Sequence, residues 1–215
     1  IAGFLFGGDV TFETLQSGLT QVNSTPTMGN LMGGKDNLEF KPYLWYEQTV
    51  DGGWLGEDDK QKKTIYGDVA EDASRLITNV VKNIGESMLD LADIFGASAE
   101  TVQKIKDYVV HLKNIDLKNL DASGVQDALN AWFSDFADTM ASDIFGDLLK
   151  QYQQAGEGLF ETAIRLAIEL ETVREIADLT GVAINVVGEE AIHLSQALIK
   201  EAGSLEDLLE DATTY

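Results

Sequence analysis

The chain has 215 residues, 44% of them hydrophobic, and its 37 acidic and 15 basic residues give a formal net charge of −22. This apolar fraction is typical of a folded protein, and the length suffices for one sizeable core or two small ones. The absence of cysteine excludes disulfides, thiol chemistry and cysteine-ligated metals in this chain. The negative charge repels phosphate and disfavours stable nucleic-acid binding.

Neither a signal peptide nor a membrane-spanning helix is expected from the sequence. The first residue is Ile1 instead of methionine, so we expect the chain to be part of a longer protein. Its apolar start is short and no basic residue precedes it, which argues against a signal peptide. The nearest approach to a membrane segment, residues 182–187, falls far short of the roughly 18–20 apolar residues that a spanning helix requires.

Residues 1–67 are predicted to form a β- and loop-rich arm. It has glycine pairs at 7–8, 33–34 and 52–53, which favour extended connections over a compact core. Short strands do not stabilise themselves, so we expect this arm to be ordered mainly by partners. Aromatic and β-branched residues in partial alternation predict strands at 10–19, 38–41, 44–50 and 62–66.

Three aromatic residues of this arm favour contact with a partner. Trp45, Tyr46 and Trp54 lie on or beside short strands flanked by glycine. Aromatic side chains in such positions often dock onto another molecule. The sequence does not indicate which molecule that is.

Residues 68–215 are predicted to form a helical domain, which begins with a helix over 69–95. Asp68 is a candidate N-cap and Gly96 a candidate stop signal, while Ser98 precedes a short second helix. The residues expected on the apolar face of the first helix are Val69, Ala73, Leu76, Ile77, Val80, Ile84, Met88, Leu91 and Phe95.

One short strand is predicted between the helices, within residues 108–117. Val110, Leu112 and Ile115 are expected to point inward there and Lys113 outward.

Two long amphipathic helices follow, over 125–144 and 159–177. The glycines at positions 156 and 158 interrupt the pattern between them and allow a bend. The apolar stripes are Val125, Leu129, Trp132, Phe133, Phe136, Met140 and Ile144 in the first helix, and Leu159, Ala163, Leu166, Leu170, Val173 and Ala177 in the second, which Phe160, Ile164 and Ile168 widen.

A last helix is predicted over 189–202, ended by Gly203, with a short one over 205–211. The predicted fold class is therefore mainly α: amphipathic helices in a bundle or in hairpins, with a β-rich, glycine-rich N-terminal section and one short strand between helices. The stripes exceed what one partner face covers, so we expect copies to associate, with Leu166 and Leu170 in the contact.

No catalytic, cofactor-binding or metal-binding residue is predicted. Glu190 and His193 have the Glu-x-x-His spacing of di-iron bundles, but the required second copy is missing and His111 is the other histidine. Residues 3–8 lack the Lys-Ser/Thr ending of a phosphate-binding loop. Trp132, Phe133 and Phe136, at helical spacing, are expected to be core residues instead of a binding box.

One stretch of the chain resembles a known family. Gly156-Glu157-Gly158-Leu159-Phe160-Glu161-Thr162, continuing through Leu166-Ala167-Ile168-Glu169-Leu170-Glu171-Thr172-Val173, is similar to the C-terminal region of phage tail tape measure proteins. The glycine- and aromatic-rich start at 1–8 and the end at 203–215 agree in order with that region.

The resemblance implies a structural virion protein at the tail tip, without enzyme activity, that takes part in tail assembly, length determination and genome ejection. It implies contact with tail tip or baseplate hub proteins, self-association as a homotrimer, and membrane contact only after ejection. Two alternatives stay open: a cell-wall-cleaving (muralytic) domain, and a membrane-active module inserted into the host membrane. The acidic helices disfavour insertion, because anionic lipid repels them.

Overall fold

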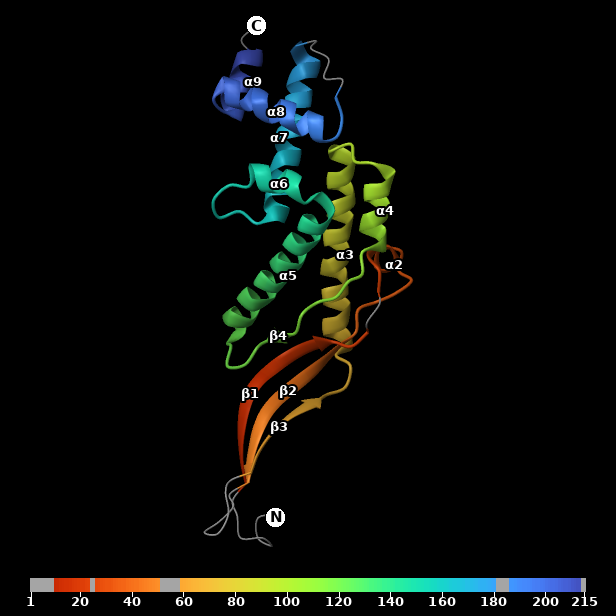
Figure 1. Cartoon of the computed structure of the whole chain (residues 1–215), viewed down its shortest axis with the longest axis vertical. Coiled ribbons are helices and arrows are strands. Elements are labelled where there is room, and N and C mark those ends of the chain that lie inside the picture. The colour runs from red at the N-terminus through yellow and green to blue at the C-terminus, as the bar shows by residue number, and fades with distance from the viewer. Residues whose placement is uncertain (1–9, 24–25, 51–58, 181–185, 214–215) are drawn as a thin grey trace. The chain divides into compact units, whose positions relative to one another are not determined.

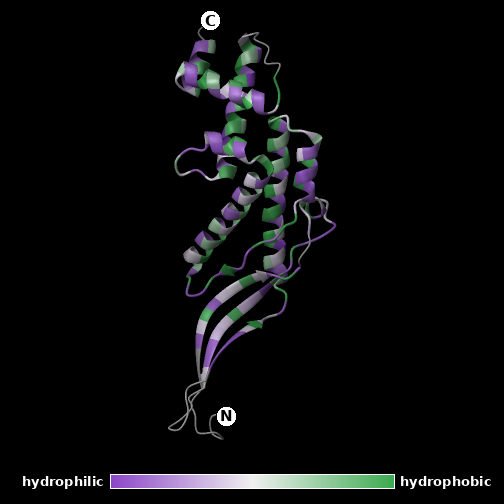
Figure 2. Cartoon of the chain, viewed as in Figure 1, coloured by the Kyte–Doolittle hydropathy of each residue, from purple (hydrophilic) through white to green (hydrophobic). Residues whose placement is uncertain are grey.

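The computed structural model describes residues 10–23, 26–50, 59–180 and 186–213, and the account below concerns these residues. They form eight helices and one four-stranded antiparallel sheet, so the protein is mainly α with some β (Figure 1). In Figure 2 the strands are mostly purple and white, whereas green is frequent along the long helices. This difference follows from the burial of one apolar face per helix.

The sheet has the strand order β3-β2-β1-β4. The four predicted strand runs are all strands in the structure, and the two runs at 38–41 and 44–50 fall largely within one continuous strand. A bulge interrupts the pairing of β1 with β2 between Thr14 and Gln16. The strands are β1 (Val10–Gln21), β2 (Phe40–Val50), β3 (Asp59–Tyr66) and β4 (Ile115–Asp116).

The predicted helices are also present, with small shifts at their ends. Ser98 is the N-cap of the short helix that follows α3, as predicted. Its Oγ accepts a hydrogen bond from the Thr101 amide at 3.2 Å. The helices are α2 (Met28–Met32), α3 (Glu71–Ile94), α4 (Ala99–Asp107), α5 (Ala122–Phe145), α6 (Asp147–Tyr152), α7 (Leu159–Thr180), α8 (Glu189–Ala202) and α9 (Leu205–Thr213).

The start of α3 differs from the prediction. The helix begins at Glu71, not after an Asp68 cap, and Leu76, expected to face inward, is 64% exposed. Ser74 and Thr78 are buried instead. Ser74 Oγ accepts a hydrogen bond from the Phe40 amide at 2.9 Å, and Thr78 Oγ1 accepts one from the Leu38 amide at 3.0 Å. The N-terminal part of α3 therefore faces the beginning of β2 with polar side chains, because the buried amides of Leu38 and Phe40 require hydrogen-bond acceptors there.

The predicted strand at 108–117 is shorter than expected, since β4 contains two residues only. Val110, Leu112 and Ile115 are nevertheless buried and Lys113 is exposed, as predicted. The Gln21 side chain satisfies backbone groups of this segment that a neighbouring strand would otherwise bond. Its Nε2 donates to the Val110 carbonyl at 3.0 Å, and its Oε1 accepts from the Leu112 amide at 2.8 Å. The segment is thus extended without a strand ladder.

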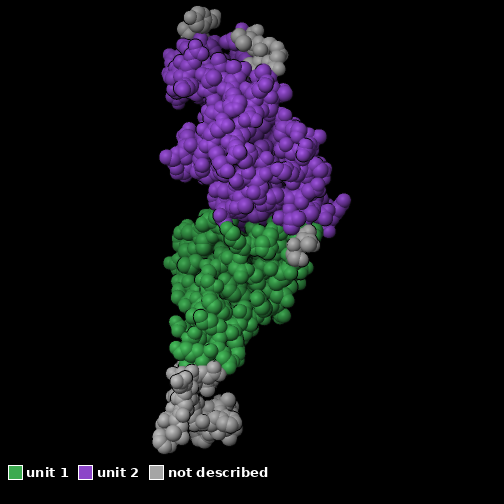
Figure 3. Space-filling view, viewed as in Figure 1, with its two compact units in different colours: residues 1–26, 36–79, 110–132 green, residues 27–35, 80–109, 133–215 purple. Residues whose placement is uncertain are grey.

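The described residues divide into two compact units (Figure 3). Unit 1 contains residues 1–26, 36–79 and 110–132, and unit 2 contains residues 27–35, 80–109 and 133–215. The predicted division into a β- and loop-rich arm at 1–67 and a helical domain at 68–215 stays a prediction. The core of unit 1 includes Leu38, Phe40, Tyr43, Ile77 and Trp132, and that of unit 2 includes Met28, Leu31, Val81, Met88, Met140, Leu149, Leu166, Leu170 and Ile192.

Candidate functional site

A charged network surrounds Arg165 in unit 2, beside the turn that separates α6 from α7. The guanidinium donates to both carboxylate oxygens of Glu157, through Nε at 2.8 Å and Nη2 at 3.1 Å. Its Nη1 donates to Glu169 at 3.1 Å, and Nη2 also donates to the Tyr152 carbonyl at 2.6 Å. The side chains of Arg165, Glu157 and Glu169 are only 20%, 21% and 16% exposed. One arginine therefore ties the turn to the end of α6 and to the next turn of α7.

The turn at 153–158 is a defined structure and not a bend in one helix. Gly156 has φ +90°, a conformation that strains other residues. A side chain at Gly158 would overlap the carboxylate of Asp138, which accepts a hydrogen bond from the Phe160 amide at 2.8 Å and so caps α7. The two glycines at the predicted joint thus have separate roles: one permits the turn and the other permits the approach of a capping side chain.

The charges of this network satisfy one another. The hydrogen bonds from Arg165 lower the pKa of Glu157 to about 2, against the effect of burial, and bonds from the Gln154 amide and the Thr162 hydroxyl act in the same direction as Arg165. The same contact with Glu157 raises the pKa of Arg165. Both groups are therefore charged at neutral pH and paired, which suits a structural tie better than proton transfer.

His193 belongs to a second hydrogen-bonded chain, with partners that the sequence did not predict. Its Nδ1 is hydrogen-bonded to the Tyr152 hydroxyl, and its Nε2 lies 3.3 Å from Glu189 Oε1. Burial raises the pKa of Tyr152, and the negative charge of Glu189 adds to this effect. A neutral phenol that donates to Nδ1 fits an imidazole with its proton on Nε2, directed at Glu189. The i,i+4 spacing of Glu189 and His193 was the available signal for this pair.

The Glu190–His193 pattern does not form a metal site in the structure. Glu190 is exposed and has no recorded interaction with His193, while His111 is exposed and belongs to unit 1. Within the described ranges, no group of three or more His, Cys, Asp or Glu residues is placed to hold a metal ion.

Trp132 and Phe136 are core residues, as predicted, whereas Phe133, which was expected in the core as well, is only half-buried. Trp132 is buried in unit 1, packs edge-on against Phe40 at 5.7 Å between ring centroids, and donates through Nε1 to the Lys113 carbonyl at 2.8 Å. Phe136 is buried in unit 2 and packs against Tyr108 at 6.3 Å.

The aromatic residues of the arm are separated by the alternation of β2. Trp45 and Tyr46 are successive residues of that strand, so their side chains lie on opposite faces of the sheet. Trp54 and the glycine-rich segment 3–8 lie outside the described residues.

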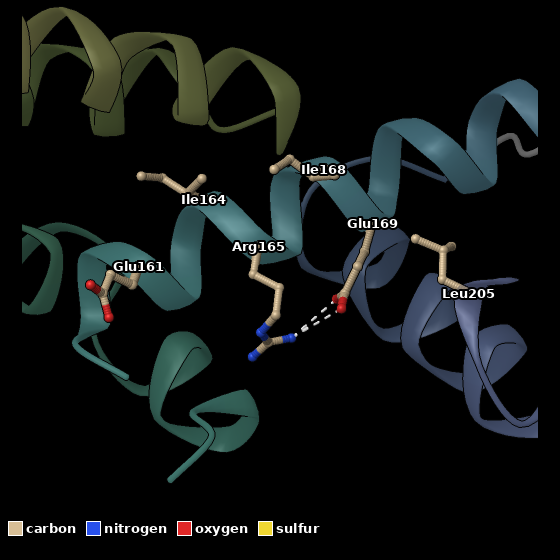
Figure 4. A pocket seen from close by; sticks show the side chains of 6 residues that line it. All are labelled: Glu161, Ile164, Arg165, Ile168, Glu169 and Leu205. Atoms are coloured by element: carbon tan, nitrogen blue, oxygen red, sulfur yellow. Dashed lines mark hydrogen bonds and ion pairs between the residues drawn. The ribbon is translucent and has the colours of Figure 1, made fainter. Parts of the chain in front are cut away.

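A hollow of about 370 Å³ lies beside the Arg165 network, on α7 and α9. Figure 4 shows Arg165 and Glu169 extending from the same side of α7, with Leu205 of α9 beyond them. Glu161, Ile164 and Ile168 complete the lining, and the two isoleucines are 40% and 56% exposed. The walls are therefore largely apolar, with an ion pair at the edge.

Comparison of the chain with protein-family models, with curated proteins and with solved structures finds no match. None of the helices in the described part is long and apolar enough to cross a membrane.

Proposed function

We propose that this chain is a structural part of a phage tail: the C-terminal segment of a tape measure protein at the tail tip, active in tail assembly, length determination and genome ejection. The proposal rests on the similarity of residues 156–173 to that family and on the arrangement of α7. Its partners are tail tip or baseplate hub proteins and further copies of the chain, as a homotrimer, with the helices completing a bundle in that assembly.

The observation that carries a structural role is a second apolar row on α7. One row is buried within unit 2, and the other, formed by Ile164 and Ile168 one turn apart, is 40% and 56% exposed. A single helix that buries one row and presents another is typical of a helix that packs between its own domain and a partner. The buried row is Ala163, Leu166, Leu170, Val173 and Ala177.

The exposed row also corrects the choice of residues for an association experiment. Leu166 and Leu170, expected in a contact between copies, are fully buried within the chain. An aspartate there would disrupt the intramolecular core and reveal nothing about association. Ile164 and Ile168 are the positions at which a contact can be broken while the fold is kept.

The direct test compares Ile164→Asp/Ile168→Asp with the control Ile164→Val/Ile168→Val, using light scattering on the full chain. We expect the unaltered chain and the valine variant to associate and the aspartate variant to be monomeric, because desolvating unpaired carboxylates in a contact is costly. Circular dichroism should be the same for all three proteins. A stable monomer for the unaltered chain, or association that both variants retain, would contradict the proposal.

The proposed place in the virion has its own test. In a reconstruction of the particle that contains this chain, density for it should lie at the tail tip, around the symmetry axis of the hub. Density elsewhere, or none in the virion, would remove the tail assignment and leave a structural protein of another assembly.

A further inference from the structure

A small pocket in unit 1 is lined entirely by aromatic rings and uncharged polar side chains. It has a volume of about 290 Å³, and its lining residues are Gln16, Tyr43, Trp45, Thr64, Tyr66 and Asn114. No aliphatic or charged side chain is part of this lining. Ligand sites usually measure roughly 300–1,000 Å³, so this pocket fits one small ring-shaped group better than a large ligand.

The strand register explains why these residues meet. Trp45 is opposite Gln16 of β1 and Thr64 of β3, and Tyr43 is opposite Tyr66. Opposite residues point to the same face of a sheet, and so do residues two apart in one strand. The pairing of three strands therefore gathers the aromatic and polar side chains on one face.

The other face of the same strands carries different residues. Leu44 and Ile65 are opposite one another there, with Ser17 beside Leu44 in β1. The aliphatic side chains of this region are thus kept out of the pocket, which makes it a poor site for a purely apolar ligand.

Two residues of the pocket are fixed by hydrogen bonds. The Tyr43 hydroxyl donates to the Ile115 carbonyl at 3.4 Å, and Asn114 Oδ1 accepts from the Thr20 hydroxyl at 2.6 Å. The Asn114 amide NH₂ is then left to donate to a ligand. The Gln16 side chain is exposed and makes no recorded hydrogen bond with the described residues, so it supplies a second donor and acceptor.

The charges around the pocket disfavour a cationic ligand. The Lys62 ammonium lies 5.6 Å from the centroid of the Trp45 ring and would repel a second cation at that ring. Burial raises the pKa of Tyr43, with a further contribution from the charge of Asp116, so the phenol stays neutral at physiological pH. The pocket therefore offers neutral hydrogen-bonding groups beside aromatic faces.

We propose that this pocket binds one sugar unit of a neutral glycan. A pyranose ring has a face of C–H groups, which packs against the negative face of an aromatic ring, and a rim of hydroxyls. Trp45 and Tyr66 supply the rings, while Gln16, Thr64 and Asn114 supply uncharged partners for the hydroxyls. This inference does not depend on the tail assignment, since it follows from the pocket alone.

The test titrates the full chain with neutral tetrasaccharides of glucose and of N-acetylglucosamine, by saturation-transfer NMR and calorimetry, to about 10 mM, ten times the Kd of a weak site. We expect one of them to bind, and Trp45→Ala or Tyr66→Ala to weaken binding at least about tenfold. Gln16→Ala, which alters an exposed side chain only, should weaken it without affecting the fold. Ile65→Ala is the matched control, because Ile65 is adjacent to both Thr64 and Tyr66 in β3 but lies on the opposite face.

The outcomes separate the proposal from its rivals. Binding that survives Trp45→Ala and Tyr66→Ala, or that Ile65→Ala removes, would overturn the assignment of this pocket. Absence of binding for every tetrasaccharide would overturn the glycan. Uridine serves as a stacking control: if it alone bound and the same variants removed its binding, the pocket would recognise a planar base instead of a sugar.

Discussion

Unit 1 and unit 2 use polar side chains in different ways. In unit 1 they complete the sheet: Gln21, Ser74 and Thr78 bond to backbone groups 34 to 91 residues away in the chain. In unit 2 the Arg165 network joins residues that are near in sequence, around helices held by apolar rows. Unit 2 also has long-range polar contacts, such as that of Arg174 Nη1 with the Ile94 carbonyl 80 residues away. We expect the stability of unit 1 to depend more on individual long-range hydrogen bonds, and that of unit 2 to depend more on core packing.

The largest expected effect is a loss of stability when the core of unit 2 is altered. Leu166→Asp should destabilise the protein by more than about 4 kcal/mol, because it places an unpaired carboxylate at a fully buried position. Thermal unfolding followed by circular dichroism measures this change. Ile168→Asp, two residues along the same helix and exposed, is the control and should retain the native helix content. Equal destabilisation by both would mean that the two rows of α7 are not distinct.

A smaller effect tests the polar contacts of unit 1. Thr78→Val keeps the shape of the side chain but leaves the buried Leu38 amide without its acceptor, which should cost about 1–3 kcal/mol. Denaturant unfolding is followed by tryptophan fluorescence, which reports on unit 1 through Trp45 and Trp132, and by circular dichroism, which reports on the helices of both units.

The matched control for this change is Thr172→Val in α7. The Thr172 hydroxyl donates only to the Ile168 carbonyl, one turn earlier in the same helix, so its removal leaves no amide unpaired. We expect a change within about 0.5 kcal/mol. If Thr78→Val were equally mild, the dependence of unit 1 on these hydrogen bonds would be wrong.

A still smaller effect concerns the ion network of unit 2. The pKa of Glu157 is about 2 in the folded protein against an ordinary value of 4.5. A lowered folded pKa gives stability that is fully present above pH 4.5 and is lost as the pH falls toward 2. Glu157→Gln should lower Tm by about 2–4 °C at pH 7 and remove part of the decline in Tm between these pH values. If Tm of the Glu157→Gln variant fell with pH as much as Tm of the unaltered chain, the fall would be caused by other carboxylates.

The last prediction is that the chain has no activity on the cell wall. We expect the chain to release no muropeptides from purified peptidoglycan, because the Arg165 network is internally paired and the sequence shows no nucleophile motif. The Tyr152–His193–Glu189 chain is the arrangement in unit 2 that most resembles an acid–base relay. Muropeptide release that His193→Gln abolishes would therefore favour the muralytic alternative over a structural role.

Much of the local structure was predictable from the residues near each element. Ser98 as a cap, Gly203 as the end of α8 and the part of the α7 stripe from Ala163 to Ala177 are local signals, and the structure confirms them. Ile164 and Ile168, which were expected to widen that stripe, are exposed instead. The start of α3 was not predictable in this way. Hydrophobic periodicity places Leu76 inward, but the amides at the start of β2 require the hydroxyls of Ser74 and Thr78, and this demand comes from a distant part of the chain.

The candidate sites also combine features that spacing within one element predicts with features that depend on several elements. Sequence spacing singled out Glu190 for His193, whereas the structure pairs His193 with Glu189 and with Tyr152 from another helix. Trp45 was recognised as a docking aromatic, but its pocket needs residues from three strands and from the segment before β4. Residue spacing within one helix or strand predicts which side chains share a face. Which side chains form a site depends on how several elements pack together.

The sequence by itself determined the helix-rich class, the strand runs, the turn at the two glycines and the strong negative charge, since these depend on local propensity, apolar periodicity and composition. Tertiary structure decided which α7 row is core and which is exposed, how Gln21, Ser74 and Thr78 complete the sheet, and which side chains line the pocket beside Trp45. The physical reason is that burial and hydrogen-bond partners depend on residues far apart in the chain, and a single sequence shows no such pairing.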